Sequence, residues 1–145
     1  MARTVVIIDD DPDDLDAVKE VLLDIDSTLI CISFTHPLEA VRLLANGMIL
    51  LPDFIFVDIN MPRMSGPDCL VSLRSVNELK SSYIVMYSTT LPLNVSRDLL
   101  LKGANYTFQK PYTTKDYLRI LEGIIYKKNH IPVAHFLRSF NNVFS

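Results

Sequence analysis

The chain has 145 residues, which is enough for one ordinary domain and too few for two comfortable ones. Apolar residues make up 49% of it and charged residues 21%, which is typical of a soluble globular protein. The net charge of −3 argues against binding to nucleic acid or to a membrane surface. The sequence has no signal-peptide pattern and no apolar run long enough to cross a bilayer, and its two cysteines are isolated, so we expect a cytoplasmic protein.

Short apolar runs rich in β-branched residues alternate with segments whose apolar residues recur at helical spacing. Alternating five times, they predict a doubly wound α/β fold, in which a parallel five-stranded sheet lies between two layers of helices. Strands are predicted over residues 4–8, 29–34, 54–57, 83–87 and 106–109. The first helix has Leu15, Val18, Leu22 and Ile25 on its apolar face, and further helices are predicted over 37–45, 67–79, 93–102 and 113–128.

Acidic residues are concentrated after the first predicted strand, since eight of the thirteen aspartates precede residue 27. Residues 11–14, Asp-Pro-Asp-Asp, have the pattern of a helix start, with a capping carboxylate, proline in the first turn and acids facing the helix dipole. Asp9 and Asp10 come before this cap, directly at the end of a buried strand. Two adjacent carboxylates would repel each other there, and a bound cation would remove the repulsion.

Further polar residues end the later strands: Asp58 the third, Ser88 the fourth and Lys110 the fifth. Because ligands of open α/β sheets bind at the carboxyl ends of the strands, we expect these side chains to meet Asp9 and Asp10. Carboxylates suit Mg²⁺, which keeps several waters and leaves room for phosphate oxygens. A lysine and a hydroxyl can stabilise an oxyanion, and a carboxylate can act as a nucleophile that forms an aspartyl phosphate. The set therefore predicts phosphoryl transfer.

The residues at these strand ends form four motifs that resemble those of the response-regulator receiver family of two-component signalling, the CheY-like superfamily. They are IIDDD at residues 7–11, VDINMP at 57–62 with Gly66, Ser88-Thr89, and Lys110-Pro111. The resemblance covers about residues 3–128 and implies a flavodoxin-like (βα)5 fold. We therefore assign residues 1–128 to a stand-alone receiver domain, without a DNA-binding or catalytic output domain, and residues 129–145 to a C-terminal tail.

The same resemblance implies a metal-dependent phospho-acceptor rather than an enzyme. A histidine kinase or a histidine phosphotransfer protein would donate a phosphoryl group to Asp58, with Mg²⁺ as the metal and Mn²⁺ as a substitute. Asp10 and Asp58 would bind the metal through their carboxylates and Asn60 through its backbone carbonyl, while Asp9 would act mainly through a coordinated water. The phosphorylated protein would signal by contact with a downstream protein target.

The resemblance also assigns the phosphoryl-stabilising residues and the switch. Lys110 would pair with the phosphoryl oxygens, and the Ser88-Thr89 pair would stabilise the phosphoryl group, with Ser88 closing onto it when the switch is on. The Lys110–Pro111 bond is a candidate for a cis peptide, as in other members of this family.

One position of the switch region departs from the family. Many receivers carry an aromatic residue three positions before the lysine, which turns inward as the serine or threonine moves. Here that position is Thr107, between Tyr106 and Phe108. Strand alternation places both aromatic rings on the face opposite Thr107, which calls the usual aromatic readout into question. We still expect Ser88 to move on phosphorylation.

The tail after the last predicted helix has apolar residues at helical spacing, which predicts a short amphipathic helix. Three roles are open for it: docking on the domain's own surface, covering the face of the fourth and fifth helices, or forming a homodimer. The spacing is carried by Val133, Phe136, Leu137, Phe140 and Phe144.

Two other functions stay open. An aspartate-based phosphohydrolase would also use the DxD of residues 9–11, but such enzymes usually follow it with a glycine or threonine turn, where this chain has Pro12. A receiver-like adaptor that is never phosphorylated would have no need of an intact acidic pair with Asp58 and Lys110. The histidines His36, His130 and His135 lack the spacing of a helical zinc site.

Overall fold

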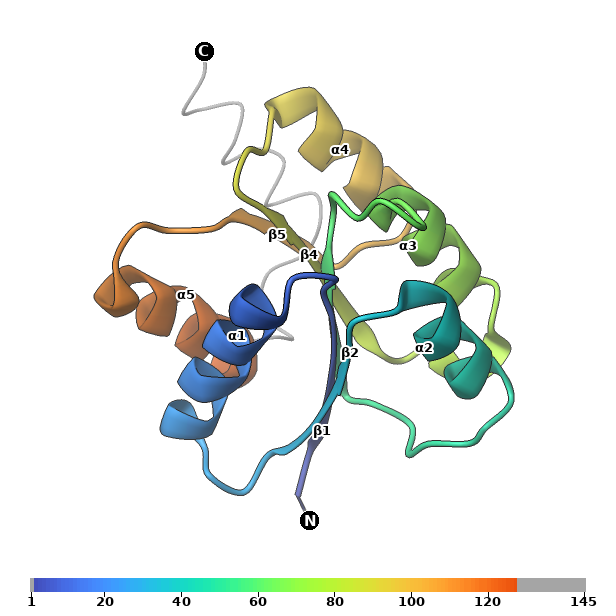
Figure 1. Ribbon diagram of the computed structural model, residues 1–145, viewed down its shortest axis with the longest axis horizontal. Coiled ribbons are helices and arrows are strands. Elements are labelled where there is room, and N and C mark those ends of the chain that lie inside the picture. The colour runs from blue at the N-terminus through green and yellow to red at the C-terminus, as the bar shows by residue number, and fades with distance from the viewer. Residues whose placement is uncertain (1, 128–145) are drawn as a thin grey trace.

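Five parallel strands form one central sheet in the computed structural model, which describes residues 2–127 (Figure 1). The strand order is β2-β1-β3-β4-β5, so the chain changes direction across the sheet between β1 and β3. This is the switch point at which open α/β sheets bind their ligands. The strands are β1 (Thr4–Ile8), β2 (Ile30–Phe34), β3 (Phe54–Asp58), β4 (Tyr83–Ser88) and β5 (Tyr106–Gln109).

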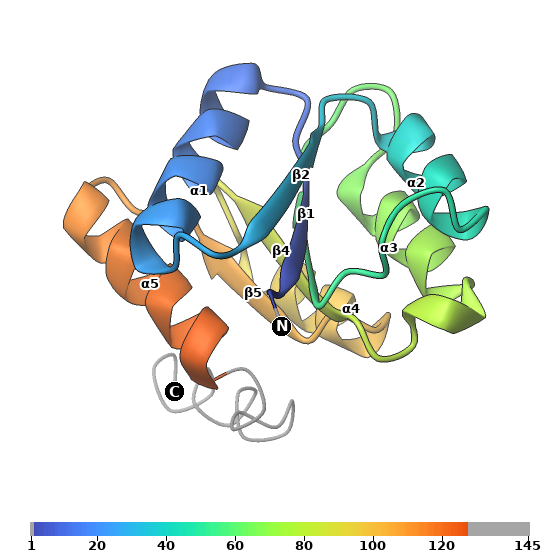
Figure 2. The same cartoon turned by 90° about the horizontal axis from the view of Figure 1, so that it is seen from below.

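Helices cover both faces of the sheet, as Figure 2 shows. One face is covered by α1 (Pro12–Ile25) and α5 (Thr114–Lys127), and the other by α2 (Pro37–Ala45), α3 (Gly66–Arg74) and α4 (Leu93–Leu101). Alternate residues of each central strand therefore pack into two separate cores. Because both faces are buried, the central strands read as continuous apolar runs. The predicted three-layer, doubly wound α/β fold is confirmed.

Helix boundaries follow the sequence signals with one exception. The predicted cap of α1 is present, because the Asp11 side chain accepts a hydrogen bond from the Asp13 backbone N–H at 3.0 Å. The helix predicted over residues 67–79 is instead shorter and ends at Arg74. Val76 has an extended backbone (φ −82°, ψ 112°) that interrupts the helix before a separate 3₁₀ turn, η1 (Asn77–Leu79).

Arg74 ends α3 and ties it to neighbouring segments by four hydrogen bonds. Its guanidinium donates to the carbonyls of Gly103, Leu79 and Ser82 at 2.8, 2.9 and 3.1 Å, and to the Asn105 side chain at 2.7 Å. The group is partly buried, so losing it would remove the donor of the Gly103 and Ser82 carbonyls. The Leu79 carbonyl and the Asn105 side chain would keep the backbone N–H groups of Ser82 and Ile84 as donors. Arg74 therefore connects α3 with the segments before β4 and β5.

Replacing Arg74 by Met should lower the free energy of unfolding by about 2–4 kcal/mol, because the loss combines charged hydrogen bonds with the desolvation of their acceptors. Urea unfolding followed by circular dichroism would measure it. Arg119→Met is the matched control: Arg119 pairs only with the nearby Asp116 among the contacts of the described chain, and its side chain is 73% exposed. A loss at Arg74 no larger than at Arg119 would contradict this role.

Within the described part of the chain, no helix combines the length and the apolar character needed to cross a membrane. Residues 129–145, for which an amphipathic helix and a role in docking or dimer formation are predicted, lie outside the described residues, as does residue 128 at the predicted domain boundary.

Candidate functional site

Three carboxylates meet at the carboxyl end of the sheet. Ile8 of β1 is the register partner of Val57 of β3, so the next residues, Asp9 and Asp58, leave the sheet side by side. Asp9 is fully buried and Asp58 is 6% exposed, while Asp10 is half-buried in the following loop. One oxygen from each of the three carboxylates lies within 4.8 Å of the others.

Crowding and burial make this cluster unfavourable without a counter-charge. Burial, followed by the charge of Asp9, raises the pKa of Asp58 to about 7, although Lys110 opposes the rise. Burial also raises the pKa of Asp9 above its usual range, against the hydrogen bond from Tyr87. A positive charge close to these oxygens would restore the ionised forms, so the cluster can hold a divalent cation with oxygen ligands.

Lys110 follows β5 and extends into the acidic cluster. Its Nζ lies 3.8 Å from Asp58 Oδ1, 3.9 Å from Asp9 Oδ2 and 2.7 Å from Asp14 Oδ2. The predicted position beside Asp58 is therefore observed, but the shortest contact is with Asp14 in the first turn of α1. From the sequence, Asp14 was expected only as a helix-start residue. The signal for a role in the site was that α1 begins only a few residues after the strand end that carries Asp9.

Tyr87 is a second site residue that sequence reasoning missed. Its hydroxyl donates a hydrogen bond to Asp9 Oδ2 at 2.7 Å, and its side chain is fully buried. Burial, together with the charge of Asp9, raises its pKa well above the usual range, so the phenol keeps its proton. The signal in the sequence was its place directly before Ser88. Its position opposite Asp58 in the register of β3 and β4 is seen only in the structure.

Ser88 is fully buried at the end of β4, and its hydroxyl is bound by the neighbouring loop. Asn60 donates from its side-chain amide to Ser88 Oγ at 2.8 Å, and the Thr90 backbone N–H lies 3.4 Å from the same oxygen. Thr89 is exposed. Asn60 thus connects the loop after Asp58, in which its backbone lies, with the hydroxyl of the predicted switch residue Ser88, which its side chain binds.

Gly66, which follows the VDINMP motif, has a steric role at the start of α3. Its backbone N–H donates to the Ile59 carbonyl at 2.8 Å. A Cβ at this position would lie 2.5 Å from Ile59 Cα and 2.7 Å from the Asp58 carbonyl oxygen. Only glycine lets α3 begin this close to the backbone that carries Asp58.

Thr107 and its neighbours lie on the faces that alternation predicts. Thr107 is 2% exposed, and its hydroxyl shares a hydrogen bond of 2.5 Å with the hydroxyl of Ser96 in α4. Tyr106 and Phe108 pack on the opposite face, in the core beneath α1 and α5. At position 107, where the resemblance implies an aromatic residue in many members of the family, the structure therefore has a buried hydroxyl bonded to Ser96.

The Lys110–Pro111 peptide bond is trans, as are the other peptide bonds of the described residues, so the expected cis bond is not observed. The trans form is the default before proline by about 0.5–1 kcal/mol. The Lys110 backbone N–H donates to the Ser88 carbonyl at 2.8 Å, which holds the chain beside β4 up to this bond.

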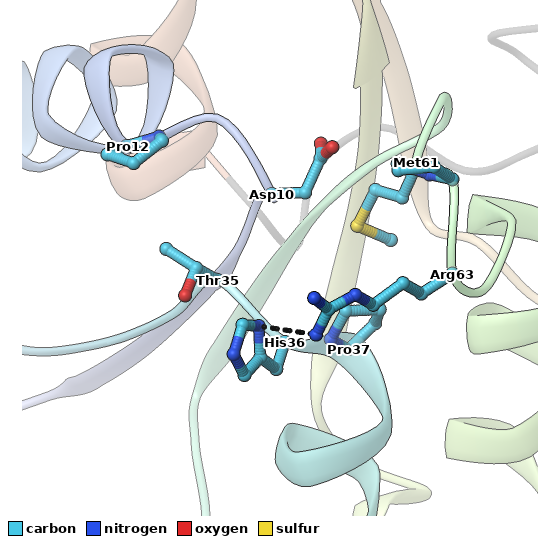
Figure 3. Close-up of a pocket in the computed structure, with 8 residues that line it drawn as sticks. Asp10, Pro12, Thr35, His36, Pro37, Met61 and Arg63 are labelled. Atoms are coloured by element: carbon cyan, nitrogen blue, oxygen red, sulfur yellow. Dashed lines mark hydrogen bonds between the residues drawn. The ribbon is translucent and has the colours of Figure 1, made fainter.

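A pocket of about 350 Å³ opens beside Asp10 (Figure 3). Its walls come from the loops after β1, β2 and β3, and they include Thr35, His36, Met61 and Arg63. Arg63 Nη1 lies 3.5 Å from His36 Nδ1. Of the three clustered carboxylates, Asp10 lines this pocket, whereas Asp9 and Asp58 are buried outside its lining.

Comparison with known proteins agrees with this arrangement. The chain matches the model of the response regulator receiver domain over residues 5–122. CheY4, a chemotaxis response regulator of Vibrio cholerae, is 23% identical with a TM-score of 0.72, and the match covers 86% of this chain and 99% of CheY4. The phosphorylated cyanobacterial phytochrome response regulator RcpA is 20% identical with a TM-score of 0.77, covering 86% and 91% of the two chains.

The Mn²⁺-bound form of the response regulator Rcp1 is 22% identical with a TM-score of 0.71, and the match covers 84% of this chain and 91% of Rcp1. At such identities these structures support the fold alone. No curated protein sequence gives a significant match. Because the family model spans most of the chain, and because the motifs at four strand ends meet in one acidic site, the chain belongs to the response regulator receiver domain family.

Proposed function

We propose that Asp58 accepts a phosphoryl group in a reaction that requires Mg²⁺, for which Mn²⁺ can substitute. The observation that carries this proposal is the group of three carboxylates whose oxygens lie within 4.8 Å of one another, with Lys110 Nζ 3.8 Å from Asp58. Receiver domains as a class accept phosphoryl groups, bind divalent metal and interact with kinases and downstream targets. The residues and the metal named here are the specific part of the proposal.

The donor set fits a hard divalent cation, because it consists of carboxylate oxygens at the carboxyl edge of the sheet, and Asp10 among them lines a surface pocket. Asp10 and Asp58 would bind the metal directly, Asn60 through its backbone carbonyl, and Asp9 mainly through a water. When bound, the ion neutralises negative charge on the carboxylates and on the incoming phosphoryl group. The raised pKa values of Asp9 and Asp58 support such a site, since both carboxylates lack sufficient counter-charge in the protein alone.

The reaction forms a bond between an Asp58 carboxylate oxygen and phosphorus, while the bond from phosphorus to the donor's imidazole nitrogen breaks. The donor would be a phosphorylated histidine of a kinase or a phosphotransfer protein. Lys110 would move from Asp14 towards the phosphoryl oxygens, a short step given its 3.8 Å distance from Asp58. Ser88 would leave Asn60 and donate its hydroxyl to the phosphoryl group.

The product is an acyl phosphate on the protein itself, so we propose a signalling protein rather than an enzyme with a separate substrate. Its output would be contact with a downstream protein. The complete set of Asp9, Asp10, Asp58 and Lys110 argues against an adaptor that is never phosphorylated. Cys31 and Cys69 are both free thiols, which supports the cytoplasmic location that we propose.

Removing divalent metal should stop the labelling of the protein. With Mg²⁺ present, we expect acetyl phosphate or a phosphorylated histidine kinase to add one phosphoryl group to each chain. Labelling in Mn²⁺ should be equal to that in Mg²⁺ or lower, and there should be no labelling in excess EDTA. Intact-protein mass spectrometry would measure the product, and the addition of excess Mg²⁺ after EDTA serves as the control. Labelling that persists without divalent metal would contradict the proposed reaction.

A further inference from the structure

The hydroxyl of Tyr87 forms a direct hydrogen bond to a carboxylate of the acidic cluster. Tyr87 is the next-to-last residue of β4, is the register partner of Asp58, and donates to Asp9 Oδ2 at 2.7 Å. None of the roles assigned above to the receiver motifs includes this residue. A buried tyrosine could simply satisfy its hydroxyl in this way, so its role depends on what the bond does to Asp9.

The Asp9 carboxylate is held at both oxygens by donors from different parts of the chain. The Asp11 backbone N–H donates to Oδ1 at 3.0 Å, and Tyr87 donates to Oδ2 at 2.7 Å. The carboxylate therefore cannot rotate about its own axis without breaking a hydrogen bond. Each carboxylate oxygen has two acceptor positions, so each keeps one for a metal or for a metal-bound water.

Tyr87 is itself held firmly by other side chains. Its ring stacks on Phe108 with centroids 5.5 Å apart and planes 11° apart, and Phe108 meets Tyr117 of α5 edge-on at 6.1 Å. Lys110 Nζ lies 5.0 Å from the centre of the Tyr87 ring. The hydroxyl thus occupies a fixed position, because moving it would require β5 and α5 to repack.

We propose that Tyr87 is a positioning residue of the metal site, whose hydroxyl fixes the orientation of Asp9 towards the ion. This inference rests on the proposed function, because it assumes that the acidic cluster binds a divalent cation. Hydrogen bonds that orient metal-binding groups typically contribute a factor of about 10–100 to metal affinity. We expect about a tenfold effect here, since Asp9 keeps its bond from Asp11 when Tyr87 is changed.

Tyr87→Phe tests the proposal, because it removes the hydroxyl and leaves the aromatic ring against Phe108 and Lys110. The Mn²⁺ dissociation constant, measured from the electron paramagnetic resonance signal of free Mn²⁺, should rise about tenfold. Calorimetric titration with Mg²⁺ should show a rise in the same direction. Tyr83→Phe is the matched control, since Tyr83 lies at the opposite end of the same strand. The Mn²⁺ dissociation constant of this variant should equal that of the wild-type protein.

A double-mutant cycle separates positioning from a general loss of packing. In an Asp9→Asn background, Tyr87→Phe should cause at most a small further change in Mn²⁺ affinity, because the carboxylate that it orients is gone. An equal loss in both backgrounds, or unchanged affinity of Tyr87→Phe in the wild-type background, would overturn the positioning role. If the wild-type protein binds no Mn²⁺, the proposed function fails first, and the inference fails with it.

Discussion

Replacing Asp58 by Asn will abolish phosphorylation of the protein by any donor. Asp58 is the one carboxylate of the cluster that ends a strand of the sheet and also lies 3.8 Å from Lys110 Nζ on one side and beside Asp9 on the other. The amide that replaces it is a poor nucleophile and carries no charge for a metal. We therefore expect labelling to fall below detection, a loss of at least about a thousandfold, since the covalent step itself is removed.

The measurement is intact-protein mass spectrometry after incubation with acetyl phosphate and Mg²⁺, followed by peptide mapping of the wild-type product. Asp68→Asn is the matched control, because Asp68 lies in the first turn of α3, outside the acidic cluster, and it should be labelled like the wild type. Persistent labelling of Asp58→Asn would place the acceptor at another residue.

The same substitution will stabilise the metal-free protein at alkaline pH. Asp58 ionises near the ordinary aspartate pKa of 3.8 when the chain is unfolded, whereas burial and then Asp9 raise its pKa to about 7 in the folded state. Between these values the folded state retains a proton that the unfolded state has lost. Stability must therefore decrease as the pH rises from about 4 to about 7 and stay lower above it.

The size of this effect follows from the pKa difference at about 1.4 kcal/mol per unit, which gives an upper limit of about 4 kcal/mol. We expect Asp58→Asn to exceed the wild type by about 2–4 kcal/mol in free energy of unfolding at pH 8 without metal, and to show a much smaller difference at pH 4. Saturating Mg²⁺ should reduce the difference at pH 8, because the ion stabilises the wild-type carboxylate.

Urea unfolding at both pH values, with and without Mg²⁺, would measure these differences. The Asp68→Asn control should stay within about 0.5 kcal/mol of the wild type throughout. A difference between Asp58→Asn and the wild type that is equal at pH 4 and pH 8 would mean that packing, rather than ionisation, causes it.

Much of the fold could be predicted because burial on both faces makes each central strand a continuous apolar run. The first polar residue after each apolar run therefore indicated where the strand ends, and parallel strands bring their carboxyl ends to one edge of the sheet. For that reason Asp9, Asp58, Ser88 and Lys110 could be placed together from the sequence. The register of Ile8 with Val57, which sets the first two side by side, came only from the structure.

The contacts that the sequence did not reveal depend on side-chain reach across the fold. Tyr87 was expected only as an apolar strand residue, yet its length carries the hydroxyl past the sheet to Asp9. Arg74 was expected inside a longer helix, but α3 ends at this residue. Its guanidinium there donates to the Gly103 carbonyl and to the Asn105 side chain, about 30 residues further along the chain. Such long-range pairs leave no periodic pattern that a single sequence can show.

The hydroxyl pair of Ser96 and Thr107 restricts how a signal can leave the site. Pulling α4 away from β5 would strand two buried hydroxyl groups, at a cost of about 1–3 kcal/mol for each. No ring at position 107 can rotate to relieve that cost. If Ser88 moves on phosphorylation as proposed, we therefore expect α4 and β5 to shift together, and the changed surface would be the joint displacement of these two elements rather than the reorientation of one side chain.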